Sequence, residues 1–288
     1  MRRTRRTLMA LALAVAAVVA VLPARGSGLR RGRVVTMSMY SAALGRPERV
    51  LVYTPPGYAS HRSRRYPVVI LLHGVPGRPE EFVQHGVPGR LDHLIAAGAI
   101  PPVIAVFPAG SDHPEDDNEW ADSEVHTSER WEEFLASDLV GWLDGRFRTI
   151  ARRQGRAIGG DSMGGFGAMN IALHHRDEFE AVSAWSGYFN ANTPSVHYPG
   201  SAFWRAYSPQ LYASSLQPSL RMSHPRISFY IGNRDRFASE NVAFDRLLTS
   251  LGVPHRFHLV TGARHGWTLW SAHLDSELKF LARGFAHP

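Results

Sequence analysis

Short apolar runs alternate along this chain with segments of helical periodicity, and this alternation constrains the fold more than any other feature. The apolar runs occupy residues 66–74, 101–110, 157–160, 181–187, 226–233 and 255–262. Several are rich in β-branched residues and end at glycine, as expected of strands buried on both faces. Helical patterns fall around 91–97, over 129–147, after residue 162, and over 240–251 and 267–285. The alternation predicts an α/β domain, with a mostly parallel central sheet and helices on both faces.

Three other segments lie outside this alternation. Residues 34–58 hold two apolar runs separated by Gly45 and Pro47, which predicts an antiparallel hairpin. The acidic segment 108–130 and the segment 188–225, rich in Tyr, Phe, Ser and Pro, are expected to form irregular, cap-like loops. The aromatic residues of the second segment fit a substrate pocket, or equally the packing of a cap against the domain; they are Tyr188, Phe189, Tyr198, Phe203, Trp204 and Tyr207.

The first 26 residues have the layout of an export signal peptide. A basic start is followed by fifteen apolar residues from Leu8 to Leu22. This length is short of the roughly 20 residues that span a bilayer, which favours a cleaved peptide over a retained anchor. TRRTLM, residues 4–9, also resembles a twin-arginine signal. We therefore expect a secreted or cell-envelope catalytic domain over 27–288, with membrane contact only through an uncleaved leader.

The positive charge of the chain belongs to this leader. The chain has 32 basic and 25 acidic residues, and seven arginines with no acid lie in residues 1–31, so the remainder balances 25 against 25. A balanced body has no electrostatic footprint for nucleic acid, and we expect none to bind. The sequence contains no cysteine, which excludes disulfides and catalysis by a thiol.

GDSMG, residues 160–164, matches the GxSxG nucleophile elbow of serine hydrolases. The motif needs small flanking residues because the serine occupies a strained turn between a strand and a helix. Both expected neighbours are present: AIGG before Ser162 and MGGFGAMNIAL after it. This context favours a nucleophile over a purely structural glycine turn.

A serine hydroxyl becomes a nucleophile only when a base accepts its proton and an acid orients that base. Asp235 and His265 each follow a predicted strand, in the chain order serine, acid, histidine that this fold requires. Catalytic groups of parallel sheets gather at those carboxyl ends. We therefore predict Ser162, Asp235 and His265 as the catalytic triad, with Asp245 and Glu240 as fallback acids that appear on a helix face.

The transition state of acyl transfer needs two donors for its oxyanion. We predict the backbone amides of Met163, directly after the nucleophile, and Val75, in the loop after residues 66–74. His73 is expected to shape that loop rather than to titrate. His174 and His175 lack a third ligand for zinc, and residues 111–120 lack the ligand spacing of a calcium loop, so no metal or cofactor is expected.

With these residues identified, the chain resembles the esterase D-like family of α/β-hydrolases over about residues 35–285. This family includes S-formylglutathione hydrolases, feruloyl and acetyl esterases and the antigen 85 mycolyltransferases. The likeness rests on SAALGRPERVLVYTPPGY, VVILLHG, RWEEFLASDLVGWLDGRFRT, RAIGGDSMGGFGAM and RHGWTLWSAHL. It implies the α/β-hydrolase fold and the same triad and oxyanion residues. Trp267 and Trp270 after the histidine look especially like antigen 85.

Three departures bear on the substrate that the resemblance implies. Antigen 85 proteins usually carry a glutamate as the triad acid, an LDG loop and a cysteine pair, whereas this chain has Asp235, His73 and no cysteine. Formylglutathione hydrolases have no export signal. A secreted serine esterase of unknown acyl preference remains, acting on a small-molecule, lipid or carbohydrate ester, with Trp120 and Trp267 as predicted substrate-binding residues.

Two alternatives stay open at this point. An acyltransferase that passes the acyl group to a sugar or lipid alcohol would use every residue named so far. A secreted, non-catalytic binding protein on a hydrolase scaffold is the alternative from another class, and the complete trio argues against it.

Overall fold

An eight-stranded sheet runs through the centre of the protein. The computed structural model describes residues 30–111, 117–123, 129–190 and 201–285. The strands are β1 (Arg33–Ser41), β2 (Arg46–Thr54), β3 (Val68–Leu72), β4 (Ile104–Pro108), β5 (Arg156–Asp161), β6 (Ala181–Trp185), β7 (Arg226–Gly232) and β8 (His255–Val260). They lie in the order β1-β2-β4-β3-β5-β6-β7-β8. β2 pairs antiparallel with β1 and β4, and every other neighbouring pair is parallel.

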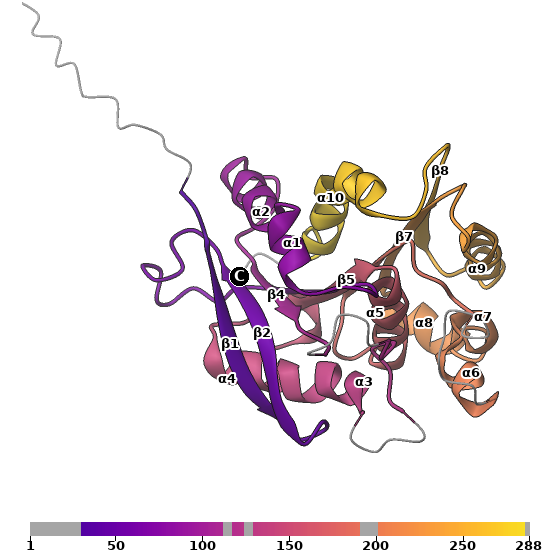
Figure 1. The fold of residues 1–288 in the computed structure, drawn as a ribbon, viewed down its shortest axis with the longest axis horizontal. Helices are drawn as coiled ribbons and strands as arrows, with labels where there is room; N and C mark the ends of the chain where they lie inside the picture. Colours follow the sequence, from indigo (N-terminus) through magenta and orange to yellow (C-terminus); the bar gives the residue numbers. More distant parts are fainter. Residues whose placement is uncertain (1–29, 112–116, 124–128, 191–200, 286–288) are drawn as a thin grey trace, which may run out of the picture.

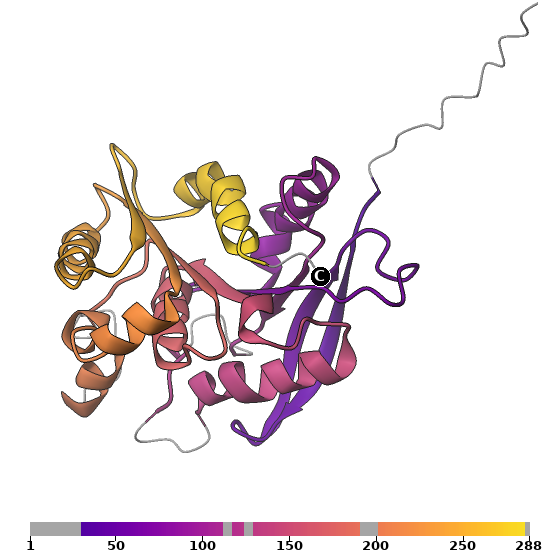
Figure 2. The same ribbon diagram turned by 180° about the vertical axis from the view of Figure 1, so that it is seen from behind.

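Helices cover both faces of this sheet. The helical elements are α1 (Glu80–Gln84), α2 (Val87–Ala96), α3 (Trp131–Glu133), the π-helical stretch η1 (Phe134–Leu139), α4 (Val140–Arg146), the 3₁₀ turn η2 (Arg153–Gly155), α5 (Met163–His174), α6 (Ser201–Tyr207), α7 (Pro209–Tyr212), α8 (Gln217–Ser223), α9 (Ala238–Ser250) and α10 (Trp267–Ala282). The core on one face is built with α1, α2 and α10, and the core on the other with α3 to α5 and α9. The two layers are separated by the sheet in Figures 1 and 2.

The predicted α/β organisation is confirmed, and so is the antiparallel hairpin, which is formed by β1 and β2. The strand residues are buried because β3 to β6 have a helical layer on each side. The helix predicted over 129–147 is present as α3, η1 and α4, which follow one another without a gap. Its middle part, η1, is π-helical. An extra backbone residue in one turn is not visible in a hydrophobic pattern.

The segment 188–225 differs from the irregular loop that was predicted. Its described part, from residue 201 onward, contains α6, α7 and α8. Tyr188, Phe189, Phe203 and Tyr207 are buried and pack together or against the core, which is the second of the two interpretations that the sequence allowed. Tyr198 lies outside the described residues. Short helices here carry few periodic apolar positions, so their pattern resembles that of a loop.

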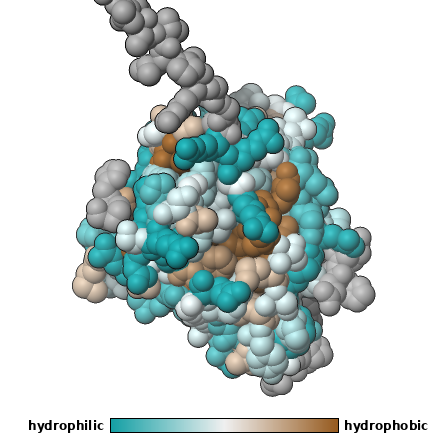
Figure 3. Space-filling view, turned by 90° about the vertical axis from the view of Figure 1, so that its left-hand side faces the viewer, coloured by the Kyte–Doolittle hydropathy of each residue, from teal (hydrophilic) through white to brown (hydrophobic). Residues whose placement is uncertain are grey.

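The outer strands form the two edges of the sheet. Figure 3 shows the side of the molecule that lies at the left in Figure 1, where hydrophilic side chains surround a smaller apolar area.

No helix within the described residues is long and apolar enough to cross a membrane. The predicted signal peptide falls in residues 1–29, which lie outside the described residues.

A buried carboxylate of α3 contacts the end of α5, the helix that follows Ser162. Oε1 of Glu132 on α3 lies 2.8 Å from Nδ1 of His174 and 2.8 Å from Nε2 of His175, at the end of α5. Tyr207 of α6 also lies near Glu132 and helps to lower its pKa. Burial alone would raise the pKa of Glu132, but the hydrogen bonds from the two histidines outweigh it and lower the pKa to about 2. The same contact raises the pKa of His175.

Replacing Glu132 with glutamine is expected to destabilise the protein most in mildly acidic solution. Glu132 stabilises the fold above its unfolded pKa of 4.5 and loses this effect as the pH falls through about 2. His175 contributes fully below 6.5 and loses its effect as the pH rises through its raised folded value. The loss for Glu132→Gln should therefore peak between pH 4.5 and 6.5, on the order of 3 kcal/mol in the free energy of unfolding.

Urea unfolding at a series of pH values measures this dependence. Glu133→Gln is the matched control, because Glu133 lies next along α3 and its ion pair with Arg130 is 37% exposed on the glutamate side. Such pairs contribute about 0–1 kcal/mol. A loss for Glu132→Gln that stays constant across the pH series would contradict the titrating cluster.

Candidate active site

Ser162 lies at the carboxyl end of β5, where the chain turns sharply into α5. Its backbone has φ 52° and ψ −118°, a conformation that a side-chain-bearing residue rarely adopts. The turn is tight because β3 runs directly alongside. A Cβ on Gly160 would lie 2.2 Å from the carbonyl oxygen of Leu72, and one on Gly164 would lie 1.9 Å from it. The glycines that flank the serine are therefore required by the close approach of β3.

Three side chains from separate crossovers meet at this turn. Oγ of Ser162 lies 2.9 Å from Nε2 of His265, and Nδ1 of His265 lies 2.6 Å from Oδ2 of Asp235. Asp235 follows β7 and His265 follows β8, as the chain order required. The Asp235 side chain has no exposed area, whereas that of His265 is 30% exposed. A buried acid, an orienting hydrogen bond and an accessible imidazole have the geometry of a serine–histidine–acid triad.

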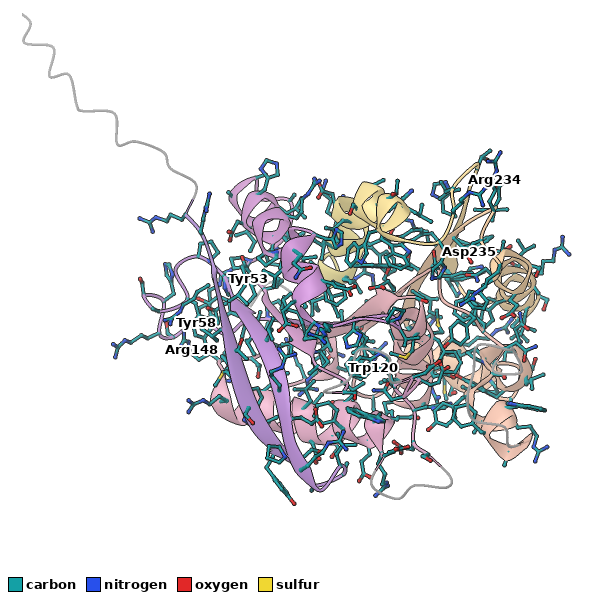
Figure 4. The ribbon with its side chains drawn as sticks, viewed as in Figure 1. Tyr53, Tyr58, Trp120, Arg148, Arg234 and Asp235 are labelled. Atoms are coloured by element: carbon teal, nitrogen blue, oxygen red, sulfur yellow. The ribbon has the colours of Figure 1, made fainter. Side chains whose placement is uncertain are left out.

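Neighbouring groups hold the acid and the base in this arrangement. Oδ1 of Asp235 accepts a hydrogen bond from the backbone amide of Phe237. The ring of Trp270 meets that of His265 edge-on, with centroids 5.3 Å apart, and the Trp270 indole donates to Oγ of Ser186. Figure 4 shows Asp235 at the end of β7 beside the loop that leads from β8. The fallback acids lie elsewhere: Asp245 bonds to His255, and Glu240 accepts from the amide of Phe189.

One predicted oxyanion donor directly follows Ser162, and the other belongs to the loop after β3. Met163 is the first residue of α5, where backbone amides have no helical acceptor and the helix dipole favours negative charge. Val75 lies in the loop after β3 and lines the cavity that contains Ser162. β3 and β5 are adjacent, and the helices that follow them, α1 and α2 after β3 and α5 after β5, pack on opposite faces of the sheet. This is the switch point where ligands of such sheets bind.

The cavity beside Ser162 has a volume of about 400 Å³. It is lined by Gly74, Val75, Pro76, Glu81, Gln84, His85, Asp161, Ser162, His265, Gly266, Trp267 and Trp270. Trp267 stacks on His85, with ring centroids 3.8 Å apart, and its indole donates to Glu81 at 3.2 Å. The predicted substrate-binding residue Trp267 therefore lies in the wall of this cavity.

The structure does not place Trp120 in that cavity. Trp120 has no exposed area, and it lies near the centre of the molecule in Figure 4. Its side chain fills space left by two glycines, since a Cβ on Gly110 would lie 2.6 Å from its ring and a Cβ on Gly167 would lie 2.4 Å from its Cβ. Its indole donates to the carbonyl oxygen of His73 at 3.1 Å. The prediction that Trp120 contacts substrate is wrong for this structure, because the residue is buried and supports the loop after β3.

His73 contributes to the shape of that loop. Its Nδ1 lies 2.8 Å from the carbonyl oxygen of Gly74, and its Nε2 lies 2.7 Å from that of Ala109. Either ring nitrogen that carries a proton thus has a carbonyl to which it can donate. This position agrees with the structural role that the sequence suggested.

Two carboxyl groups of the cavity were not singled out from the sequence. Asp161 directly precedes the nucleophile and is 1% exposed, and Glu81 lies on α1. Asp161 is the variable position of the GxSxG motif, which is a signal that draws attention to it. Nothing in the sequence around Glu81 indicates that α1 borders the site.

No group of three or more potential metal ligands occurs within the described residues. His174 and His175 are engaged by Glu132 instead of lying free at a solvated helix end. Part of the acidic segment considered for calcium, residues 112–116, lies outside the described residues.

Known proteins resemble this chain in sequence and in fold. The Esterase family, described as "Putative esterase", matches residues 41–281. An esterase of Mycobacterium tuberculosis (strain H37Rv) is 34% identical over 150 residues, which cover 51% of this chain and 30% of that protein. The chain thus spans less than a third of that relative's length.

Solved structures extend the likeness over most of the domain. A ferulic acid esterase superposes with a TM-score of 0.78 and 28% identity, covering 88% of this chain and all of that one. An S-formylglutathione hydrolase of Agrobacterium tumefaciens superposes with a TM-score of 0.72, 21% identity and coverage of 89% and 97%. The second of these supports the fold alone. The sheet order, the glycine-flanked serine and the family match together show that this chain belongs to the Esterase family and has the α/β-hydrolase fold.

Proposed function

We propose that this protein is a serine carboxylic-ester hydrolase. His265 accepts the proton of Ser162 as Oγ attacks the ester carbonyl, and Asp235 stabilises the imidazolium that forms. The amides of Met163 and Val75 stabilise the oxyanion. His265 then protonates the leaving alcohol, and water activated by the same imidazole releases the acid from the acyl-enzyme. The observation that carries the proposal is the continuous hydrogen-bond chain from Ser162 through His265 to Asp235.

The relatives narrow the class of ester that we propose. A relative from Xylanibacter ruminicola is named an endo-1,4-beta-xylanase/feruloyl esterase, and a similar structure is titled a ferulic acid esterase. We propose a small-molecule ester with an aromatic or aliphatic acyl group, bound between Trp267 and the loop at Val75. We further propose that the basic, apolar leader exports the domain to the cell envelope or beyond.

A fluorophosphonate probe tests the nucleophile directly. Such probes phosphonylate a serine that is activated by a neighbouring base, so the intact protein should be labelled once, on the peptide that contains Ser162. Peptide mass spectrometry locates the label. No labelling of the folded protein would sink the proposal and would favour a non-catalytic binding protein on a hydrolase scaffold.

A panel of esters then identifies the substrate preference. Acyl length and alcohol are varied, and the products are analysed with and without an added sugar or lipid alcohol. Free acid as the dominant product supports hydrolysis. Acyl transfer to the alcohol at the expense of free acid would show that the protein is an acyltransferase, which uses the same triad.

A further inference from the structure

A buried carboxyl group that takes no part in the triad lies directly beneath the nucleophile. Asp161 is 1% exposed and lines the cavity that contains Ser162. Its carboxyl group lies beside Gly74: the Gly74 amide acts to lower its pKa, and a Cβ at Gly74 would lie 3.0 Å from its Oδ2. Its other oxygen, Oδ1, is buried and has no hydrogen-bond partner within the described residues. Burying a carboxyl with one unsatisfied oxygen is costly, so the position calls for a functional explanation.

The amide and the carbonyl group of Gly74 each lie against a side chain. Its amide lies beside the carboxyl group of Asp161, and its carbonyl oxygen lies 2.8 Å from Nδ1 of His73. The carbonyl of Gly74 and the N–H of Val75 belong to one planar peptide unit and point in opposite directions. The contact that fixes the Gly74 carbonyl therefore also fixes the direction of the Val75 amide. Asp161 lies beside the preceding amide, where a hydrogen bond would limit the rotation of the Gly74 backbone.

The space around Gly74 leaves little freedom for adjustment. A Cβ at Gly74 would lie 2.9 Å from Cβ of Ser162 and 3.0 Å from Oδ2 of Asp161. The loop thus rests directly on the nucleophile and on the residue before it. Because an oxyanion donor acts only when it is aimed at the reacting oxygen, a small rotation of this loop should reduce the rate.

We propose that Asp161 is a positioning residue of the oxyanion hole, which acts by holding the amide of Gly74 and thereby the orientation of the Val75 amide. This inference rests on the proposed function, since it assigns Val75 as a donor to the oxyanion. Asp161 itself does not touch the reacting atoms.

The charge of Asp161 matters because an oxyanion forms nearby. Burial, and then the negative charge of Glu81, raise the pKa of Asp161 well above its usual range. The other titratable groups around it are Tyr230 from β7, His85 after α1, and His265. Among the described residues, no lysine or arginine lines the cavity. The raised pKa favours the neutral form of the carboxyl, which adds no negative charge that would oppose the oxyanion.

Two substitutions at this position separate the hydrogen bond from the charge. In Asp161→Asn the uncharged amide oxygen can still accept from Gly74, so kcat for a small activated ester should stay within about threefold of wild type. In Asp161→Ala the anchor is lost, and kcat should fall about 10- to 100-fold with KM nearly unchanged, somewhat less than for deletion of a whole oxyanion donor.

Asp92→Ala is the matched control for a buried aspartate with a structural role. Asp92 is 4% exposed and accepts from the amide of Gly32 and from Tyr53, away from the site. This variant should lower the unfolding midpoint but leave the kcat of the folded protein unchanged. If Asp161→Ala fails to fold, Asp161→Asn still decides, since a fall in its kcat of tenfold or more would overturn the proposal.

A difference infrared spectrum tests the protonation of Asp161. Wild type minus Asp161→Asn at neutral pH should show the carbonyl stretch of a protonated carboxyl, and its absence would overturn the neutral anchor. Wild-type kcat in a folded Asp161→Ala protein would overturn the positioning role. Fluorophosphonate labelling at Ser162 is measured in each variant. Wild type that is neither labelled nor active contradicts the proposed function, whereas a labelled, fully active Asp161→Ala protein contradicts only this inference.

Discussion

Replacing Ser162 with alanine is expected to abolish ester hydrolysis while leaving the protein folded. Within the described residues, the Ser162 hydroxyl is the only nucleophilic group that lies in hydrogen-bond contact with His265, at 2.9 Å. Loss of the nucleophile in a serine hydrolase costs on the order of a millionfold in kcat, because the remaining groups act as a unit. Alanine retains the backbone of the turn, so the unfolding midpoint should change little. Turnover of a small activated ester and urea unfolding measure the two quantities.

Two aspartate variants provide the graded comparison for this result. Asp235→Asn should lower kcat about 10⁴-fold, because an amide in place of the carboxylate favours the wrong imidazole tautomer. Asp245→Asn is the control, since its partner is His255 at 3.0 Å and not His265. It should leave kcat unchanged. Residual activity near wild type in the Ser162 variant, or a larger loss in Asp245→Asn than in Asp235→Asn, would refute the assignment of the triad.

Replacing Gly164 with alanine is expected to be the most destabilising single change around the elbow. The added Cβ would lie 1.9 Å from the carbonyl oxygen of Leu72 and 2.8 Å from that of His73. Both oxygens belong to the backbone at the end of β3, so neither can move without displacing the central strand. Overpacking against flexible side chains costs about 1–3 kcal/mol, and a clash with fixed backbone should exceed that range. Urea unfolding, or failure to recover folded protein, reports the effect.

Gly141→Ala is the matched control for this substitution. Gly141 lies on the exposed face of α4, and a Cβ there would meet no atom within 4 Å. The same chemical change should stabilise the protein by about 0.5–1 kcal/mol, because glycine is a poor helix former. Equal effects of the two substitutions would mean that the contact between the elbow and β3 is looser than described.

The central part of the sheet could be predicted from sequence because β3 to β7 are buried on both faces. Such strands appear as continuous apolar runs, and each was found within a few residues of its observed position. Ser162, Asp235 and His265 could be proposed for a related reason. Each lies directly after such a run, and topology alone brings the carboxyl ends of parallel strands together.

Trp120 and Asp161 show why the rest of the site could not be predicted. Trp120 has φ 53°, and its ring enters a space that exists only because Gly110 and Gly167 lack side chains. Gly110, Trp120 and Gly167 are not adjacent in the sequence, so no local pattern shows that they meet. The role of Asp161 depends on Gly74, 87 residues earlier in the chain. Contacts of this kind follow from packing and have no local periodicity.

The three residues proposed for the triad lie far apart in the sequence, so esterase activity depends on complete folding of the sheet. Ser162 and His265 are 103 residues apart in sequence, and β6, β7 and β8 must all join the sheet before they meet. A chain in which β7 and β8 have not yet paired would lack Asp235 and His265 beside Ser162. Under the proposed function, we expect such a chain to show no esterase activity. The return of esterase activity during refolding should then time the docking of these last strands.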